Sequence, residues 1–264
     1  MRTYGLIGYP LSHSFSERYF SDKFAKEQIA HLYNYQLFPL SNLTELFDLL
    51  ATHPNLNGLN VTIPYKQRIL PLLNDIDEEA QKVGAVNCIA IAPDRSMKGY
   101  NTDIYGFERS LLSLFNPNKT SLQALLLGTG GAAKAVRYVL QKNKIAYTSA
   151  SRNPEDNIDN SNLNPSSVIG YTDIDATIIA QHLLIINTTP LGMYPDIHSS
   201  PTLPYQALTP QHLCYDLVYN PIETQFLQKA RLQGARTQNG LDMLYFQAEA
   251  AWEIWKKAQK NAKT

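Results

Sequence analysis

The residue best suited to proton chemistry is Lys66, which stands in the first turn of a short helix expected over Tyr65–Leu73. An apolar, β-branched run, Leu56–Ile63, precedes this helix and ends at Pro64. A helix dipole disfavours an ammonium group at the helix N-terminus, and this position therefore suits a proton donor. The alternative is an exposed, solvated lysine without a chemical role.

Hydroxyl groups gather at the start of another expected helix. Ser12, Ser14 and Ser16 lie on alternate residues before the apolar positions Phe20 and Phe24. Ser14 and Glu17 have capping-box spacing, which explains one serine as a helix cap. Three hydroxyls are more than a cap needs, and at a helix N-terminus they also suit a carboxylate or a phosphate.

Three further polar residues interrupt apolar or helical patterns. Asn87 lies within Val83–Ala92, which reads as an apolar strand, so its amide needs backbone or ligand partners. Asp103 stands between a turn and a helix start, where an N-cap is the simple explanation. Gln247 falls on the apolar side of a long amphipathic helix expected over 239–260, and it either satisfies the core or faces a cleft.

A glycine-rich turn separates an apolar run from an amphipathic helix. The run ends at Leu127, and Gly128, Thr129, Gly130 and Gly131 follow, with Ala133 completing G-x-G-x-x-A spacing. Such a turn allows a sharp bend, admits a pyrophosphate at a helix N-terminus and packs that helix against the strand. The pattern predicts a dinucleotide site, and the alternative is a tight strand-to-helix turn without a ligand.

The strand expected after this amphipathic helix indicates which dinucleotide binds. NAD-binding units place a carboxylate on the ribose 2′-hydroxyl about 20 residues after the glycine turn. Here that position reads Ala150, Ser151, Arg152, Asn153, and the first carboxylate is Glu155. Arg152 can pair with a 2′-phosphate, so we expect NADP rather than NAD. A surface arginine in a loop is the alternative.

Composition limits the remaining possibilities. The chain has 264 residues, 44% of them apolar, which is enough for two ordinary domains. Basic and acidic residues both number 23, so no net field favours nucleic acid or an anionic membrane. Cys88 and Cys214 are far apart in apolar surroundings and read as reduced core residues, without a metal site. No apolar run is long enough for a signal peptide or a membrane span, and we expect a cytoplasmic protein.

The elements that must position these residues alternate between strands and helices. The remaining strand candidates are Thr3–Ile7, Tyr33–Phe38, Leu183–Asn187 and His212–Tyr219. The segment NTTPLGM at 187–193 leaves regular structure at the carboxyl end of its strand, where ligands lie in open α/β sheets.

Taken together, these segments resemble the shikimate dehydrogenase family. The motifs that carry the resemblance are GYPLSHSFS at 8–16, NVTIPYK at 60–66, GAVN at 84–87, GYNTDIYGF at 99–107, GTGGAA at 128–133, SR at 151–152, NTTPLGM at 187–193, DLVYNP at 216–221 and NGLDMLYFQA at 239–248. Each is common alone, but their order and spacing are specific.

The resemblance implies an α/β protein with two domains. Residues 1–103 and 241–264 would form an α/β substrate-binding and catalytic domain, to which the C-terminal helix returns, with a cleft between the domains. Residues 104–240 would form a doubly wound Rossmann domain that binds NADP(H). The implied activity is NADP-dependent, reversible reduction of 3-dehydroshikimate to shikimate in aromatic amino-acid biosynthesis.

The same resemblance assigns roles to individual residues. Lys66 and Asp103 would form the catalytic pair, and both would also contact the substrate. Ser14 and Ser16 would hold the substrate carboxylate, and the carboxylate and hydroxyls would also bind Thr62, Asn87, Tyr219 and Gln247. The cofactor residues would be Gly128, Thr129, Gly130, Gly131 and Ala132 at the pyrophosphate, Ser151 and Arg152 at the ribose, Leu217 and Gly240 at the nicotinamide, and Thr188.

One departure and two rival functions remain. Family members often have proline where Glu17 stands, and a substrate-facing Glu17 would conflict with a carboxylate site beside it. A related enzyme acting on quinate is one rival, with the extra hydroxyl read near Thr62 and Tyr219. A cofactor-sensing binding protein is the other, although Lys66 and Asp103 argue against it. The expected partner is a small-molecule substrate, and the oligomer is a monomer or a homodimer.

Overall fold

The computed structural model describes residues 1–11, 14–116, 122–155 and 168–261. The chain forms two compact units. Unit 1 comprises Met1–Thr102 and Gln247–Thr264, and unit 2 comprises Asp103–Phe246. Both changes of unit fall inside helices, namely α5 (Thr102–Leu112) and α9 (Leu241–Asn261).

Unit 1 is built on a mixed sheet in the order β2-β1-β3-β5-β6-β4. Strand β1 pairs in parallel with β2 and β3, whereas β5 runs antiparallel to β3 and β6. The strands are β1 (Arg2–Gly8), β2 (Tyr33–Pro39), β3 (Leu56–Val61), β4 (Asp75–Ile76), β5 (Cys88–Ile91) and β6 (Met97–Tyr100). Nearly every residue of β1 is buried, because helices cover both faces of the sheet.

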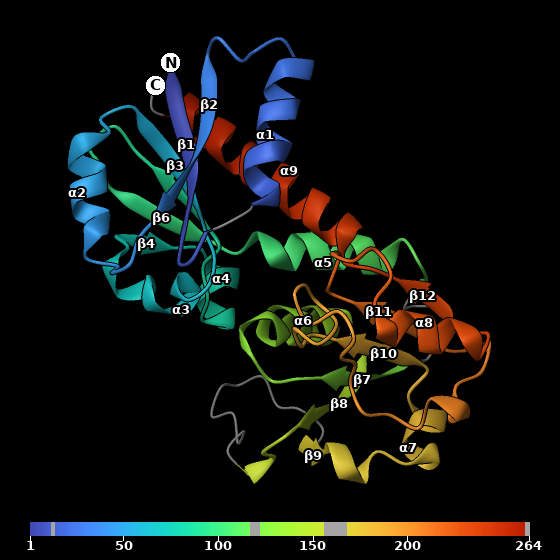
Figure 1. Cartoon of the computed structure of the whole chain (residues 1–264). Helices are drawn as coiled ribbons and strands as arrows, with labels where there is room; N and C mark the ends of the chain where they lie inside the picture. The colour runs from blue at the N-terminus through green and yellow to red at the C-terminus, as the bar shows by residue number, and fades with distance from the viewer. Residues whose placement is uncertain (12–13, 117–121, 156–167, 262–264) are drawn as a thin grey trace. The chain divides into compact units, whose positions relative to one another are not determined.

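Aromatic side chains fill one face of this sheet. Helices α1 (Phe15–Lys26) and α9 lie side by side along it, and α2 (Glu45–Thr52) covers the opposite face (Figure 1). The ring of Trp255 stacks on Tyr4 at a centroid distance of 4.6 Å, and its Nε1 donates to the Ile89 carbonyl at 2.9 Å. Through these contacts the last helix of the chain completes the core of the first unit.

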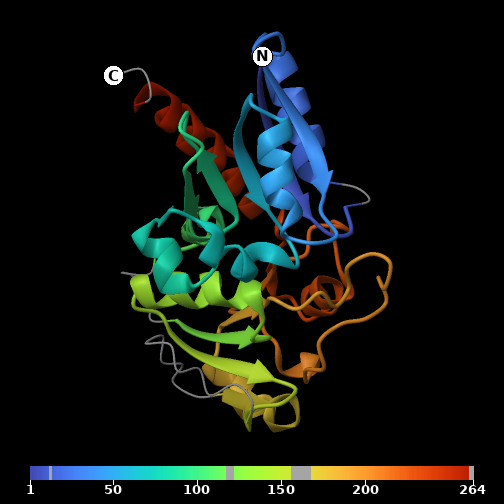
Figure 2. The same ribbon diagram turned by 90° about the vertical axis from the view of Figure 1, so that its left-hand side faces the viewer.

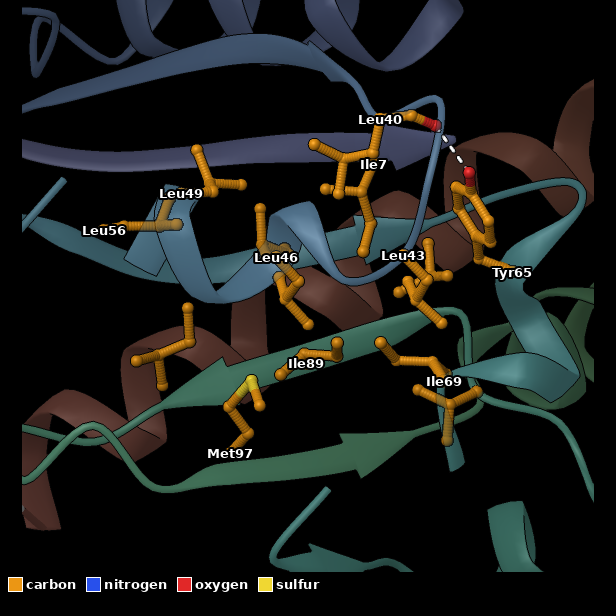
Figure 3. Packing of buried hydrophobic residues seen from close by; sticks show 14 of the residues in the cluster. Ile7, Leu40, Leu43, Leu46, Leu49, Leu56, Tyr65, Ile69, Ile89 and Met97 are labelled. Atoms are coloured by element: carbon orange, nitrogen blue, oxygen red, sulfur yellow. Dashed lines mark hydrogen bonds between the residues drawn. The ribbon is translucent and has the colours of Figure 1, made fainter. Parts of the chain in front are cut away.

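The opposite face holds an aliphatic core (Figure 3). Leu46 and Leu49 of α2 pack there with Ile7, and Tyr65 donates from its hydroxyl to the Leu40 carbonyl at 2.5 Å. Tyr65 belongs to the short helix α3 (Tyr65–Arg68), which is followed by the 3₁₀ turn η1 (Leu70–Leu72) and helix α4 (Glu78–Val83). This hydrogen bond fixes the first turn of α3 against the core.

Unit 2 contains a parallel sheet in the order β12-β11-β10-β7-β8-β9. Its strands are β7 (Gln123–Leu127), β8 (Ala146–Ser151), β9 (Val168–Gly170), β10 (Leu184–Asn187), β11 (Leu213–Asp216) and β12 (Arg236–Gln238). Read from β9, the order is that of a doubly wound dinucleotide-binding fold, which reverses between β7 and β10. The expected α/β class with a Rossmann-type unit is therefore confirmed.

Helices cover both faces of the second sheet. In Figure 2, α6 (Gly131–Lys142) runs along one face, while α7 (Ala176–Gln181) lies on the other. Helix α8 (Gln225–Leu232) packs with α7 in the same core cluster. On the face away from that cluster, Tyr215 of β11 donates to Ser110 of α5 at 2.8 Å. The described residues of the unit also include the 3₁₀ turns η3 (Tyr171–Asp173) and η4 (Tyr205–Ala207).

Two elements differ from the sequence-based expectation. The strand expected from Val83 begins only at Cys88, because Val83 ends α4 and Gly84 caps that helix in a left-handed conformation, with φ of 67°. The helix expected over Tyr65–Leu73 stops at Arg68 and continues as η1. Pro71 lies in that turn and has no N–H to extend an α-helix.

The structure can be compared with what the composition predicts about cysteines, membrane spans and metal sites. Cys88 in β5 and Cys214 in β11 are both buried free thiols, as expected. No helix within the described ranges combines the length and the hydropathy needed to span a bilayer. The described residues also contain no group of three or more His, Cys, Asp or Glu side chains placed to hold a metal ion.

We predict that Gly58→Ala destabilises unit 1. A Cβ at Gly58 would lie 2.3 Å from the Trp255 indole nitrogen, and the buried ring cannot move without losing its bond to Ile89. The expected loss in free energy of unfolding is about 1–3 kcal/mol. Urea unfolding followed by tryptophan fluorescence measures it, because both tryptophans lie in α9 of unit 1. Arg18→Ala, an exposed change in α1, should alter the midpoint little, and an equal shift in both variants would contradict the prediction.

Candidate functional site

The glycine turn after β7 packs closely against the end of β10. Gly128 has a φ of 100°, and a Cβ there would lie 2.9 Å from the Thr188 hydroxyl. That hydroxyl donates to the Leu127 carbonyl at 2.7 Å, directly before the turn. Gly128 must be glycine because of its positive φ and because Thr188 lies so close to it. Thr188 is therefore part of the glycine turn's local structure.

The N-terminus of α6 has no side-chain cap. Gly130 is the N-cap residue and makes no side-chain capping bond, and a Cβ there would meet nothing within 4 Å. The first N–H groups of this 12-residue helix therefore have no capping side chain, and the space in front of them is open. Uncapped N–H groups and the positive end of a helix dipole suit a phosphate group.

A pocket of about 600 Å³ opens at this turn. It contains six residues that the sequence assigned to the cofactor, namely Gly128, Thr129, Gly130, Ser151, Arg152 and Thr188. Gly131, Ala132, Leu217 and Gly240 are not among its lining residues. Arg152 is its only charged lining residue within the described part of the chain, so the pocket favours an anion at the end of β8.

Sequence reasoning missed part of this lining. Asn153, Tyr171 and Thr202 belong to the pocket, as do Thr189, Pro190 and Leu191 of the NTTPLGM segment. The Tyr171 hydroxyl is buried and has no hydrogen-bond partner in the structure described. Burial raises the pKa of Tyr171, and the charge of Arg152 partly offsets that effect. No local motif marks Tyr171 or Thr202 as pocket residues. Tyr171 reaches the pocket because β9, which precedes it, pairs in parallel with β8, and Thr202 reaches it through the chain that follows β10.

Leu217 and Gly240 meet where β11 and β12 end. A Cβ at Gly240 would lie 2.1 Å from the Leu217 carbonyl oxygen, so only glycine fits. The Gly240 N–H donates to the Val218 carbonyl at 3.2 Å, and the Leu217 N–H donates to the Asn187 carbonyl at 2.9 Å. The two residues expected at the nicotinamide are therefore joined at the carboxyl edge of the sheet.

A buried carboxylate supports this edge. Asp216, the last residue of β11, accepts from Asn187 Nδ2 and the Val218 N–H at 3.0 Å, and from the Thr224 hydroxyl at 2.5 Å. Burial raises the pKa of Asp216 to about 6, although the three hydrogen bonds lower it. The cluster ties the ends of β10 and β11 to the start of α8, and sequence reasoning did not identify it.

In unit 1 the serine segment caps α1. Ser14 is the N-cap residue and accepts from the Ser16 N–H at 3.1 Å, and Ser12 lies outside the described residues. Glu17 is exposed in the first turn of the helix. The buried Tyr35 hydroxyl donates to Asn60 Oδ1 at 2.8 Å, and burial raises the pKa of Tyr35 while the nearby Ser16 side chain opposes that effect.

Thr62 and Lys66 follow β3 on one continuous turn. The Thr62 N–H donates to the Ile7 carbonyl, and its own carbonyl accepts from the Tyr65 N–H, both at 2.9 Å. The Lys66 carbonyl accepts from Val86 N–H at 2.7 Å, and its side chain is half-buried. This backbone pairing holds Lys66 next to the segment that leads to Asn87.

Asn87 and Gln247 come together through Thr102. Asn87 Oδ1 accepts from the Thr102 N–H at 2.6 Å, and the Thr102 hydroxyl lies 3.2 Å from the same oxygen. The Thr102 hydroxyl also lies 3.3 Å from Gln247 Oε1. All three residues are at least nine-tenths buried, so residues far apart in the sequence form one polar cluster in unit 1.

Asp103 and Tyr219 belong to unit 2. Asp103 is the second residue of α5 and half-buried, in the first turn, where the helix dipole favours a carboxylate. Tyr219 follows β11, and burial raises the pKa of its hydroxyl. Within unit 1 the structure thus joins Asn87 and Gln247 to Thr102 and places Thr62 and Lys66 on one turn, whereas Asp103 and Tyr219 stand in the other unit.

Comparison with known proteins gives consistent matches. A family model described as the shikimate dehydrogenase substrate binding domain matches residues 6–89. A shikimate dehydrogenase (NADP(+)) from Desulforamulus reducens is 35% identical over 267 residues, which cover 95% of this chain and 88% of the relative. A crystal structure of a shikimate dehydrogenase in complex with NADP⁺ is 33% identical with a TM-score of 0.85, covering 99% of this chain and 94% of that one. A quinate dehydrogenase from Corynebacterium glutamicum in complex with NAD is 31% identical with a TM-score of 0.83, covering 96% and 93%.

The raised pKa of Asp216 predicts a pH-dependent stability of unit 2. Its carboxyl is easier to protonate in the fold, at about 6 against an ordinary 3.8, so its contribution is largest below pH 4 and falls as the pH rises to 6. The difference corresponds to about 3 kcal/mol. Urea unfolding followed by circular dichroism should show wild type losing its advantage over Asp216→Asn between pH 4 and pH 7. A difference that does not change with pH would mean that Asp216 ionises normally.

Proposed function

The chain belongs to the shikimate dehydrogenase family, and from this premise we infer that it is an NADP-dependent oxidoreductase acting on a CH–OH group. Its reaction is the reversible hydride transfer that reduces 3-dehydroshikimate to shikimate, in the pathway to the aromatic amino acids. We propose that residues of both units take part in this reaction.

The observation that carries the cofactor assignment is the charge at the end of β8. Among the described residues that line the pocket, Arg152 is the only charged one, and Glu155 is not part of this lining. A guanidinium can form two parallel hydrogen bonds with a phosphate. Arg152 and Ser151 therefore bind the 2′-phosphate, and Gly128 to Ala132 hold the pyrophosphate at the open N-terminus of α6. Thr188 supports the glycine turn, and Leu217 and Gly240 line the nicotinamide.

Unit 1 supplies most of the substrate contacts. Ser14 and Ser16 bind the substrate carboxylate at the N-terminus of α1, where the helix dipole favours an anion. Thr62, Asn87 and Gln247 bind the carboxylate and ring hydroxyls, together with Tyr219 of unit 2. The exposed position of Glu17 is compatible with an anion held by the serines.

Lys66 and Asp103 act as the catalytic pair. Bound NADPH supplies the hydride that reduces the ring ketone. Reduction leaves an alkoxide, and the Lys66 ammonium polarises the ketone and gives that oxygen its proton, with the lysine acting as base in the reverse direction. Asp103 holds a substrate hydroxyl and orients the lysine. Fixed polar partners for each hydroxyl also reject analogues that lack it.

An enzyme acting on quinate with NAD is the second candidate. It is favoured by the similarity to the quinate dehydrogenase of C. glutamicum. Initial rates with shikimate and with quinate, each measured with NADP⁺ and NAD⁺, separate the two. We expect the highest kcat/KM for shikimate with NADP⁺, and a preference for quinate with NAD⁺ would favour the second candidate.

We further propose a cytoplasmic enzyme that acts as a monomer or homodimer on a small-molecule substrate, without nucleic acid or membrane partners. Two buried free thiols support a reducing compartment. Equal numbers of acidic and basic residues give no field to attract polyanions.

We predict that Lys66→Ala lowers kcat by about 10²–10⁴-fold, the usual range for loss of a general acid. KM for shikimate should change little, because the serines, amides and Thr62 still bind the substrate. Steady-state rates measure both constants. Gln67→Ala, an exposed change on the same helix, is the control and should keep the wild-type rate. A normal rate in Lys66→Ala would remove the lysine from the chemistry.

We predict that Arg152→Ala weakens binding of NADP⁺ by about tenfold or more and leaves binding of NAD⁺ nearly unchanged. The guanidinium pairs with the 2′-phosphate, which NAD⁺ lacks. Calorimetric titration with each cofactor measures the two dissociation constants. Arg231→Ala, an exposed arginine of α8 paired with Glu223, serves as the control for loss of a charge. Equal weakening for both cofactors would place Arg152 away from the phosphate.

A further inference from the structure

Thr102 stands between two buried amides of unit 1. It is the first residue of α5, and 2% of its surface is exposed. Its N–H lies 2.6 Å from Asn87 Oδ1, and its hydroxyl oxygen lies 3.2 Å from Asn87 Oδ1 and 3.3 Å from Gln247 Oε1. None of the roles assigned above uses this residue.

The donors of Thr102 determine how the amide of Asn87 is turned. The first N–H groups of a helix have no partner within the helix, and Asn87 Oδ1 accepts the one at Thr102. If the amide were flipped, its NH₂ group would face this N–H, and the buried N–H of Thr102 would lose its acceptor. Asn87 must therefore keep its oxygen on Thr102 and its Nδ2 on the other side.

The hydroxyl hydrogen of Thr102 is then available for Gln247. A hydroxyl has one hydrogen, and Asn87 Oδ1 already accepts from the backbone. Donation to Gln247 Oε1 turns the Nε2 group of Gln247 away from Thr102. Within the described part of the chain, neither Asn87 Nδ2 nor Gln247 Nε2 has a hydrogen-bond partner.

We propose that Thr102 is a positioning residue that holds Asn87 and Gln247 with their NH₂ groups towards the substrate. The inference rests on the proposed function, in which both amides bind the substrate. Four N–H donors are then offered to substrate oxygens, which act as acceptors at these two residues. A hydroxyl bound by either amide must give its own hydrogen to another group, such as a carboxylate. The site thus selects a substrate by the direction of its hydrogen bonds as well as by their number.

The first test removes only the Thr102 hydroxyl. Thr102→Val keeps the shape of the side chain and the backbone N–H to Asn87, but it leaves Gln247 Oε1 without its donor. We expect KM for shikimate to rise about fivefold to tenfold, with kcat within about threefold of wild type and KM for NADP⁺ unchanged. Thr102→Ser restores the hydroxyl and should restore KM. A merely structural role would not give this split between the constants or this rescue.

The second test reads the direction of the Gln247 amide. Gln247→Glu keeps an oxygen for the Thr102 hydroxyl and replaces the NH₂ group by a second acceptor. If Nε2 faces the substrate, calorimetric affinity for shikimate should fall by about tenfold or more. If the amide is turned the other way, the variant should bind shikimate as wild type does, and this result would overturn the proposal.

The outcomes separate this proposal from the proposed function. Wild-type oxidation of shikimate is measured first, and its absence would reject the function itself. With wild-type activity present, an unchanged KM in Thr102→Val would reject the positioning role alone. The urea midpoint of each variant is compared with that of wild type to check folding. If Thr102→Val does not fold, Thr102→Ser and Gln247→Glu decide. An unchanged affinity for shikimate in Gln247→Glu rejects the proposal, and a tenfold loss of affinity supports it.

Discussion

Asn87 is buried, and three of its polar groups each hold a different segment of unit 1 through a hydrogen bond. Its N–H donates to Tyr100 at the end of β6, and its carbonyl accepts from Val61 at the end of β3. Its side-chain oxygen takes the first N–H of α5. The cost of an unpaired buried polar group, about 1–3 kcal/mol, makes this arrangement hard to change. The start of α5 and the turn that carries Lys66 are both placed by it.

In unit 2 the buried acceptor that holds several segments together is a carboxylate. Asp216 is fully buried at the carboxyl edge of the sheet, and it collects donors from the end of β10, from its own strand end and from the start of α8. The loops at this edge carry Leu217, Tyr219 and the NTTPLGM segment. In each unit, therefore, a buried acceptor with donors from distant segments fixes the backbone that carries the proposed ligand-binding residues.

Sequence patterns predicted the parts of this protein that depend on local chemistry. The glycine turn and the lack of a carboxylate at the end of β8 are both read from residues close together in the chain, and Gly128 and Arg152, the residues expected at the cofactor, line the same pocket. The amphipathic pattern of α9 was likewise sufficient. The apolar run from Val83 led to a wrong start for β5, because its residues are apolar owing to their burial and not because the backbone is extended. Asp77 and Gly84, which cap α4 at its two ends, are the sequence signals of that helix. Tyr171, Thr102 and Asp216 could not be found, since their roles depend on partners from other segments.

Helix α9, at the end of the chain, supplies part of the core of the first unit. The aromatic core of unit 1 needs Trp252 and Trp255, which are translated only after the whole of unit 2. A ribosome therefore releases β1 to β6 with one face of their sheet uncovered, while Asp103–Phe246 is a continuous segment that can fold as soon as it has emerged. All residues of unit 2 are therefore synthesised before the residues that close the core of unit 1. Until then, Tyr4, Phe20 and Phe24 lack the aromatic neighbours that Trp252 and Trp255 provide in the folded protein.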